Sequence, residues 1–199
     1  MIAVATSSHL LLAQSRATSA PQAARKISTD MTCASELGTG LKTKRRFCDV
    51  VITPLASESV TIKIPPHTGS ALLQFDLHNR FDISTQPLAP LLFAHQVATV
   101  SVVRSPGAPI ESAAVMGEIR VAADAYDRVE SGTAPGVLKA VAPGQPQSVR
   151  MTIPAGVASV AILGVKLAAT GPTGATEVFE TQGRPIAVVS NVRVDYTPR

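Results

Sequence analysis

The stretch SVTIKIPPHTGSALLQFDLHNR, residues 59–80, contains two runs of alternating apolar and polar residues, separated by two prolines and a glycine. Such alternation is typical of β-strands, because successive side chains of a strand point to opposite faces of its sheet. Proline cannot donate a hydrogen bond to a strand ladder, so Pro65 should end the first strand. Pro66 and Gly69 should then reverse the chain. The stretch therefore predicts two strands joined as a hairpin.

A second segment, SVRMTIPAGVASVAILGVKL at residues 148–167, repeats this layout. It also has an alternating strand that ends in Ile-Pro, a turn region with Gly156, and another run rich in aliphatic residues. The likeness is short. Two explanations stay open, an ancient duplication or two independent solutions to the same hairpin problem.

The rest of the chain shows the same short strand-like runs, rich in Val, Ile and Thr and broken by Gly and Pro. About ten such strands predict an all-β fold, an antiparallel two-sheet β-sandwich in jelly-roll-like or Greek-key order. We expect at most one short helix, for which VAADAYDRVES at 121–131 is the best candidate, although it could equally continue a strand. A length of 199 residues suits a single domain, predicted over residues 30–199. The further strand candidates are VATVSVV (97–103), AAVMGEIRV (113–121), GVLKAV (136–141), TEVFET (176–181) and PIAVVSNVRVDY (185–196).

Residues 1–29 look unlike the rest and are interpreted as a signal-like or flexible N-terminal segment. Residues 2–13 are mostly apolar and small residues follow, as in a secretory signal, although no Lys or Arg precedes the apolar run. We therefore expect a secreted or periplasmic protein. An uncleaved segment could instead act as an arm that pairs with the sheet edge of a neighbour. No apolar run reaches the length of a transmembrane span, and none is predicted.

The chain has two cysteines, Cys33 and Cys48, and neither lies in a Cys-x-x-Cys pair. In an exported protein they should form a disulfide that closes a loop of about 15 residues and stabilises the fold by about 3 kcal/mol. This bridge would tie the loop with the basic run at 42–46 onto CDVVIT, taken as the first strand. The alternative is two reduced cysteines in a cytosolic protein.

The formal net charge of +4 raises the question of nucleic-acid binding. Arg16, Arg25 and Lys26 supply three of these charges within the first 27 residues, which contain no acid. Only the run at 42–46 remains clearly basic, and aromatic residues for base stacking are few. We therefore expect no nucleic-acid partner.

Gln74, Asp76 and His78 alternate with three apolar residues and should share one face of their strand. One interpretation is a jelly-roll metalloprotein that uses the Asp76 and His78 face, although three or four converging ligands would be needed. The other is a polar outer face on which Asp76 raises the pKa of His78. We favour the outer face and expect no cofactor.

Carbohydrate is a common ligand of secreted sandwiches, but sugar rings usually stack on aromatic side chains and this chain has no Trp. Tyr126, with Asp124, Asp127 and Arg128, is the candidate binding patch. The alternatives are that Tyr126 covers the edge of the core and that the acidic residues belong to a solvated turn.

The chain lacks both a Gly-x-Ser-x-Gly elbow and a phosphate-binding loop. We therefore expect a non-enzymatic, exported structural or interaction module of the cell envelope or extracellular space. Its partner would be another protein or a second copy of itself. A carbohydrate- or ligand-binding module is the first alternative, and the metalloprotein is the second.

Overall fold

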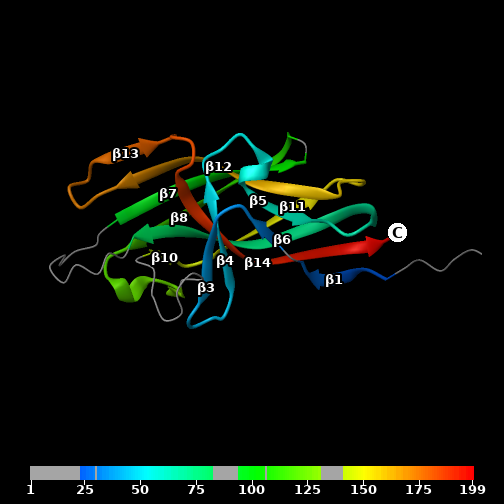
Figure 1. Cartoon of the computed structure of the whole chain (residues 1–199), viewed down its shortest axis with the longest axis horizontal. Coiled ribbons are helices and arrows are strands. Elements are labelled where there is room, and N and C mark those ends of the chain that lie inside the picture. The colour runs from blue at the N-terminus through cyan, green and yellow to red at the C-terminus, as the bar shows by residue number, and fades with distance from the viewer. Residues whose placement is uncertain (1–22, 30, 83–93, 106, 131–140) are drawn as a thin grey trace, which may run out of the picture.

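The computed structural model describes residues 23–29, 31–82, 94–105, 107–130 and 141–199. These residues form two antiparallel sheets that pack face to face, which confirms the all-β two-sheet sandwich (Figure 1). Within the described ranges there is no α-helix, only the two short 3₁₀ turns η1 (Ala56–Glu58) and η2 (Ala122–Asp124). The predicted helix at 121–131 is therefore limited to the single turn η2, followed by the short strand β9.

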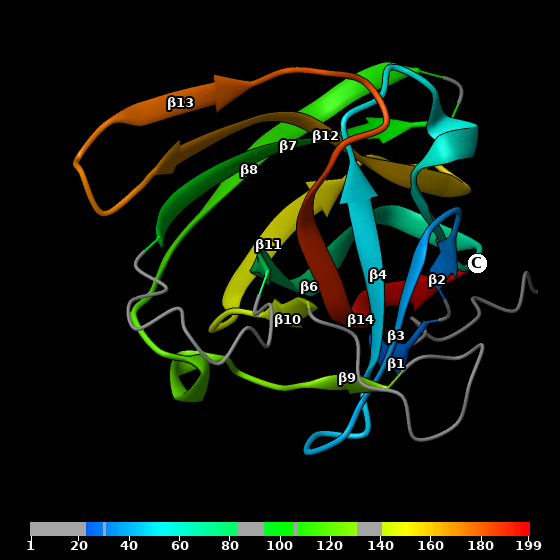
Figure 2. The same ribbon diagram turned by 60° about the vertical axis from the view of Figure 1, so that its left-hand side comes forward.

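The larger sheet has eight strands in the order β10-β6-β14-β4-β3-β9, with β1 on β14 and β11 on β6. The smaller sheet has six, in the order β2-β5-β12-β7-β8, with β13 on β12 (Figure 2). The eight strands are β1 (Arg25–Ser28), β3 (Glu36–Gly40), β4 (Arg46–Val51), β6 (His67–Asp82), β9 (Val129–Glu130), β10 (Val141–Pro143), β11 (Gln147–Ile153) and β14 (Pro185–Pro198). The six are β2 (Met31–Cys33), β5 (Val60–Lys63), β7 (Ala94–Arg104), β8 (Ala108–Ile119), β12 (Ser159–Thr170) and β13 (Thr176–Phe179).

The two similar segments are not hairpins, and that prediction was wrong. In each, the chain passes from one sheet to the other at its Ile-Pro corner, so the two flanking strands never pair. They pair reciprocally instead: β5 of the first segment with β12 of the second, and β6 of the first with β11 of the second. His67 links the corners, since its ring nitrogens lie 2.8 Å from the Pro65 carbonyl oxygen and 3.3 Å from that of Pro154.

The main core fills the space between the sheets with aliphatic side chains. The alternation predicted for β6 is confirmed on this side, since Leu73, Phe75 and Leu77 are all buried. They meet apolar residues of the smaller sheet and of β14, including Val60, Ile62, Val100, Val102, Val160, Ile162, Val189 and Val194.

The predicted strands at 97–103, 113–121, 176–181 and 185–196 correspond to β7, β8, β13 and β14. The candidate at 136–141 lies outside the described residues except for Val141, which begins β10. At the N-terminus, β1 pairs with β14, so a described strand lies within residues 1–29. Residues 1–22, including the signal-like run, lie outside the described ranges. No helix long and apolar enough to cross a membrane occurs in the part of the chain that the structure describes.

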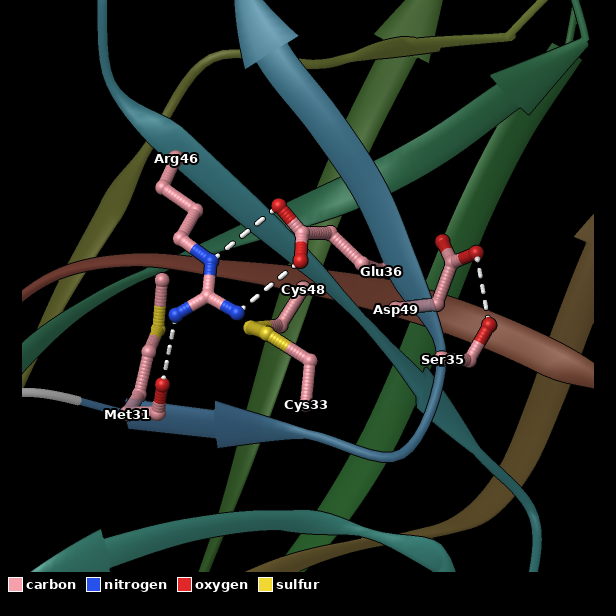
Figure 3. Close-up of a disulfide and its surroundings, with 7 residues drawn as sticks. All are labelled: Met31, Cys33, Ser35, Glu36, Arg46, Cys48 and Asp49. Carbon is pink, nitrogen blue, oxygen red and sulfur yellow. Dashed lines mark hydrogen bonds and ion pairs between the residues drawn. A yellow bond between two sulfur atoms is a disulfide. The ribbon is translucent and has the colours of Figure 1, made fainter. Parts of the chain in front are cut away.

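Cys33 and Cys48 form a disulfide with a Cα–Cα distance of 5.5 Å, as predicted (Figure 3). The bridge joins β2 of the smaller sheet to β4 of the larger one. It therefore ties the two sheets together, rather than fixing a loop onto the first strand, because β1, β2 and β3 all precede β4. Beside it the Arg46 guanidinium binds both carboxylate oxygens of Glu36 and the Met31 carbonyl oxygen.

Candidate functional site

His78 was expected on a solvated outer face of β6, and this prediction was wrong. The side chain does point away from the main core, but it is 0% exposed. A second apolar cluster covers this end of the outer face, built from Leu37, Phe47, Val129 and Val188 with Tyr126 and Val141 against it. The ring of Phe47 meets that of His78 edge-on, at a centroid distance of 5.5 Å.

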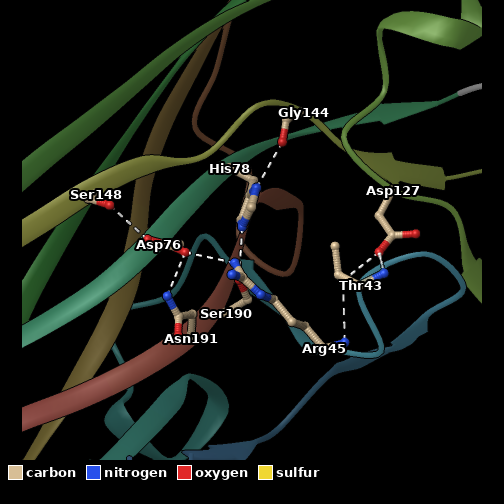
Figure 4. A network of polar contacts seen from close by, with 9 residues as sticks. All are labelled: Thr43, Arg45, Asp76, His78, Asp127, Gly144, Ser148, Ser190 and Asn191. Atoms are coloured by element: carbon tan, nitrogen blue, oxygen red, sulfur yellow. Dashed lines mark hydrogen bonds and ion pairs between the residues drawn. The ribbon is translucent and has the colours of Figure 1, made fainter.

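Both nitrogens of the His78 ring have protein partners (Figure 4). Nδ1 lies 2.8 Å from the carbonyl oxygen of Gly144, which can only accept, so Nδ1 carries the proton. Nε2 lies 2.9 Å from Ser190 Oγ and accepts from that hydroxyl. Burial lowers the pKa of His78, and this effect outweighs the upward pull of the Gly144 hydrogen bond and of the Asp76 charge. Asp76 does pull the pKa of His78 upward, as predicted, but the net shift is downward because burial dominates.

The Asp76 carboxylate is fully hydrogen-bonded within the protein. Oδ1 accepts from Ser148 Oγ at 2.8 Å. Oδ2 accepts from Asn191 Nδ2 at 2.8 Å and from the Arg45 guanidinium at 2.9 Å. These bonds tie the β3–β4 turn, which carries Arg45, to β6, β11 and β14 (Figure 4).

The proposed metal pair of Asp76 and His78 therefore consists of two side chains that are each occupied by other partners. A metal ion needs several ligand atoms that converge on one point. Among the described residues, no group of three or more His, Cys, Asp or Glu side chains could hold one. Asp76 and His78 are better explained as buried residues that hold the second apolar cluster and the β3–β4 turn against the outer face of β6.

The Tyr126 ring lies against both His78 and Arg45. Its ring is 5.3 Å from the His78 ring, and the Arg45 guanidinium carbon is 5.9 Å from the Tyr126 ring centre. Arg45 thus contacts an aromatic face with one side of its planar group and the Asp76 carboxylate with another. Tyr126 covers the edge of the second cluster, as one of the two interpretations expected.

Asp127 is a buried structural residue. Its carboxylate accepts from the backbone N–H groups of Lys42, Thr43 and Arg128 and from the Thr43 hydroxyl. Burial opposes the charged form, but these hydrogen bonds outweigh it and lower the pKa of Asp127. The carboxylate lies so close to Gly40 that a Cβ atom at that position would stand 2.2 Å from Asp127 Oδ2. Asp127 therefore holds the turn between β3 and β4.

The other two members of the predicted patch, Asp124 and Arg128, are exposed. Asp124 Oδ2 accepts from the backbone N–H groups of Arg120 and Val121, which lowers the pKa of Asp124. Tyr126, Asp127 and Arg128 do line one shallow pocket of about 250 Å³, together with Leu41 and Lys42. Three of the four predicted residues are thus brought together, and Asp124 lies outside that lining.

A different surface, on the outer face of the smaller sheet, was not predicted. Met116, Val97, Ala168 and Val178 stand in register on four adjacent strands, β8, β7, β12 and β13, which run side by side in Figure 2. The two end members are strongly exposed, Met116 at 66% and Val178 at 60%. We call these four residues the apolar row. Apolar side chains that line up on an outer face indicate a contact surface more clearly than scattered ones.

The sequence did contain a signal for this row. Val97 has the strand phase opposite to that of Ala98, Val100 and Val102, which are buried, so the alternation along β7 puts an apolar residue on the outer face. Nothing in the sequence indicated that three apolar side chains of other strands would align with it, because register is set by the whole sheet.

Comparison of the chain with protein-family models, with curated proteins and with solved structures finds no match.

Proposed function

We propose that the chain is an exported, non-enzymatic interaction module that associates with a second copy through the apolar row. The observation that carries this proposal is the alignment of Met116, Val97, Ala168 and Val178 across four strands of one outer face. The Cys33–Cys48 disulfide supports the export part, because such bonds persist in oxidising compartments. The signal-like apolar run at residues 2–13 supports it as well.

The arrangement of the row suits a two-fold contact. An axis parallel to the strands, between β7 and β12, would place Met116 opposite Val178 and Val97 opposite Ala168. Each of these contacts would then occur twice, as in an isologous dimer. Two sheet faces pack at about 10 Å from one another through such apolar side chains.

The neighbouring residues fit the rim of an interface. The next row along the strands holds Glu118, His95, Thr170 and Thr176, which are in register with one another. On the other side, Lys166 pairs in register with Thr99. An apolar centre with a polar surround is the usual composition of a protein–protein contact.

Sedimentation velocity over a concentration series tests the proposal. The unchanged protein should show a monomer–dimer equilibrium, and Met116→Asp combined with Val178→Asp should shift it to monomer. Leu55→Asp is the matched control, because Leu55 is 52% exposed but lies beside η1, outside the row. A protein that is monomeric at every concentration, or a control that dissociates equally, would contradict the proposal.

A second candidate function is ligand binding in the pocket that Tyr126, Asp127 and Arg128 line with Lys42. Asp127 is occupied by the turn, so Arg128 and Lys42, both exposed, are the side chains left to contact a ligand. Binding of a sugar that is lost in Arg128→Ala and kept in Met116→Asp would favour this function over the first.

A further inference from the structure

The outer face of the larger sheet carries a second polar pocket, of about 190 Å³, beside Asp76. Three cationic side chains line it, Lys26 from β1, Arg150 from β11 and Arg193 from β14. Gln74, Ser148 and Asn191 add uncharged polar groups. Cations brought together from three strands in a pocket this small favour a negatively charged occupant.

Register places two of these cations on either side of one residue. Gln74 on β6 pairs with Arg150 on β11 and with Arg193 on β14. Adjacent strands are about 4.8 Å apart, so the two arginine backbones are separated by roughly 10 Å. Two long side chains that start at this spacing can reach a single group held above Gln74.

Within the part of the chain that the structure describes, neither arginine has its charge offset by an acidic side chain. Among the described residues, the side chains of Arg150 and Arg193 have no hydrogen-bond or ion-pair partner. Lys26 shares its charge with Asp195, at 3.7 Å, and Asp76 is neutralised by Arg45, at 2.9 Å. Two unpaired guanidinium groups therefore remain, and guanidinium is the side-chain group best shaped to bind oxyanions with two parallel hydrogen bonds.

We propose that this pocket binds the carboxylate of an acidic sugar between Arg150 and Arg193. The neighbouring polar groups favour a sugar acid over a bare ion. The Ser148 hydroxyl donates to Asp76, and the Asn191 and Gln74 amide nitrogens donate to Asp76 and Asp195. Their oxygens can still accept hydrogen bonds from sugar hydroxyls, which sulfate lacks. The site lies on the sheet opposite the apolar row, so this inference does not depend on the proposed self-association.

Calorimetric titration at low ionic strength tests the assignment, with sodium glucuronate, sodium sulfate and neutral glucose as the three probes. Glucuronate should bind more tightly than sulfate, and glucose should not bind. Arg150→Gln and Arg193→Gln should each weaken glucuronate binding at least tenfold, because each removes a charged hydrogen-bond donor to the carboxylate. Arg150→Lys should give an intermediate loss, because lysine keeps the charge but not the forked geometry.

Arg104→Gln is the matched control, because Arg104 is an exposed arginine on β7 of the other sheet. Circular dichroism should show that all four variants are folded, as expected for exposed positions. Glucuronate binding that survives both pocket substitutions, or that Arg104→Gln weakens equally, would overturn the proposal. Binding of sulfate without glucuronate would assign the pocket to an inorganic anion and overturn it too.

Discussion

His78 and Ser190 share a hydrogen bond of 2.9 Å in a place where neither side chain is exposed to solvent. The serine hydroxyl donates to the imidazole, and the other ring nitrogen donates to Gly144. A second proton on the ring would remove the acceptor that Ser190 uses and leave a buried charge. The hydrogen bonds of His78 therefore require the neutral form of its ring.

This arrangement predicts a pH dependence of stability. The pKa of His78 in the folded protein is below its ordinary value of 6.5, so the unfolded chain takes up the proton first as the pH falls. The stability that neutral His78 contributes is fully present above pH 6.5 and declines below it, down to the pKa of the folded state. Urea unfolding at about pH 7.5 and about pH 5 should show this loss in the unchanged protein and less of it in His78→Gln. Equal losses in both proteins would contradict the role given to His78.

Asp127 should be far more important for stability than Asp124, although the two lie close together in the chain. Asp127→Ala leaves the partly buried backbone donors of Lys42 and Thr43 in the β3–β4 turn, and that of Arg128, without their acceptor, which should cost about 2 kcal/mol. Asp124→Ala is the matched control and should change the free energy of unfolding by less than about 1 kcal/mol, since Asp124 is exposed.

The lowered pKa of Asp127 adds a second test. The stability that the charged carboxylate contributes is present above its ordinary pKa of 3.8 and is lost as the pH falls through the lower folded value. The gap in stability between the unchanged protein and Asp127→Ala should therefore narrow in strong acid. A gap that stays constant would show that the charge is not involved.

Reduction of the disulfide should destabilise the protein by about 3 kcal/mol, the value expected for a loop of about 15 residues. The comparison is urea unfolding of the oxidised protein, of the reduced protein and of Cys33→Ala combined with Cys48→Ala. The last two should unfold at similar, lower urea concentrations. If reductant leaves the midpoint of urea unfolding unchanged, the Cys33–Cys48 disulfide does not contribute to stability.

Two glycines, one inside the smaller sheet and one in its turns, allow the same substitution to alanine to be compared at a crowded and at an open position. A Cβ atom at Gly164 would lie 2.6 Å from the Val51 carbonyl oxygen, where β4 crosses closely over β12. At Gly171 no atom lies within 4 Å of the added carbon. Thermal unfolding should therefore show that Gly164→Ala is destabilised, by about 1–3 kcal/mol, and that Gly171→Ala is close to neutral. Similar midpoints for the two variants would contradict the close approach of the strands.

The sequence predicted the local parts of this fold well, because they depend on neighbouring residues. The alternation of Leu73, Phe75 and Leu77 identified the core face of β6, and the Ile-Pro pairs marked the ends of strands. It could not predict which strands pair. A strand that ends at Pro65 can be followed by a hairpin or by a crossover to the other sheet, and the local pattern is the same for both.

The candidate site was harder to predict for the same reason. The partners of His78 come from positions 66 and 112 residues away in the chain. Alternation correctly placed His78 on the face opposite Leu77, but not the Phe47 and Tyr126 rings that cover it. Cys33 and Cys48 could be paired in advance, because only one pairing was available.

The reciprocal pairing of the two similar segments also determines how the chain must fold. β5 and β6 find their partners β12 and β11 roughly 70–100 residues further along, and β1, β4 and β6 all pair with the last strand, β14. Neither half of the chain contains a complete sheet, so neither can reach the native state alone. Contacts this distant in sequence make folding slow, because long loops must close before any of them forms. The sandwich should therefore assemble in one late, cooperative step rather than grow from its N-terminus during synthesis.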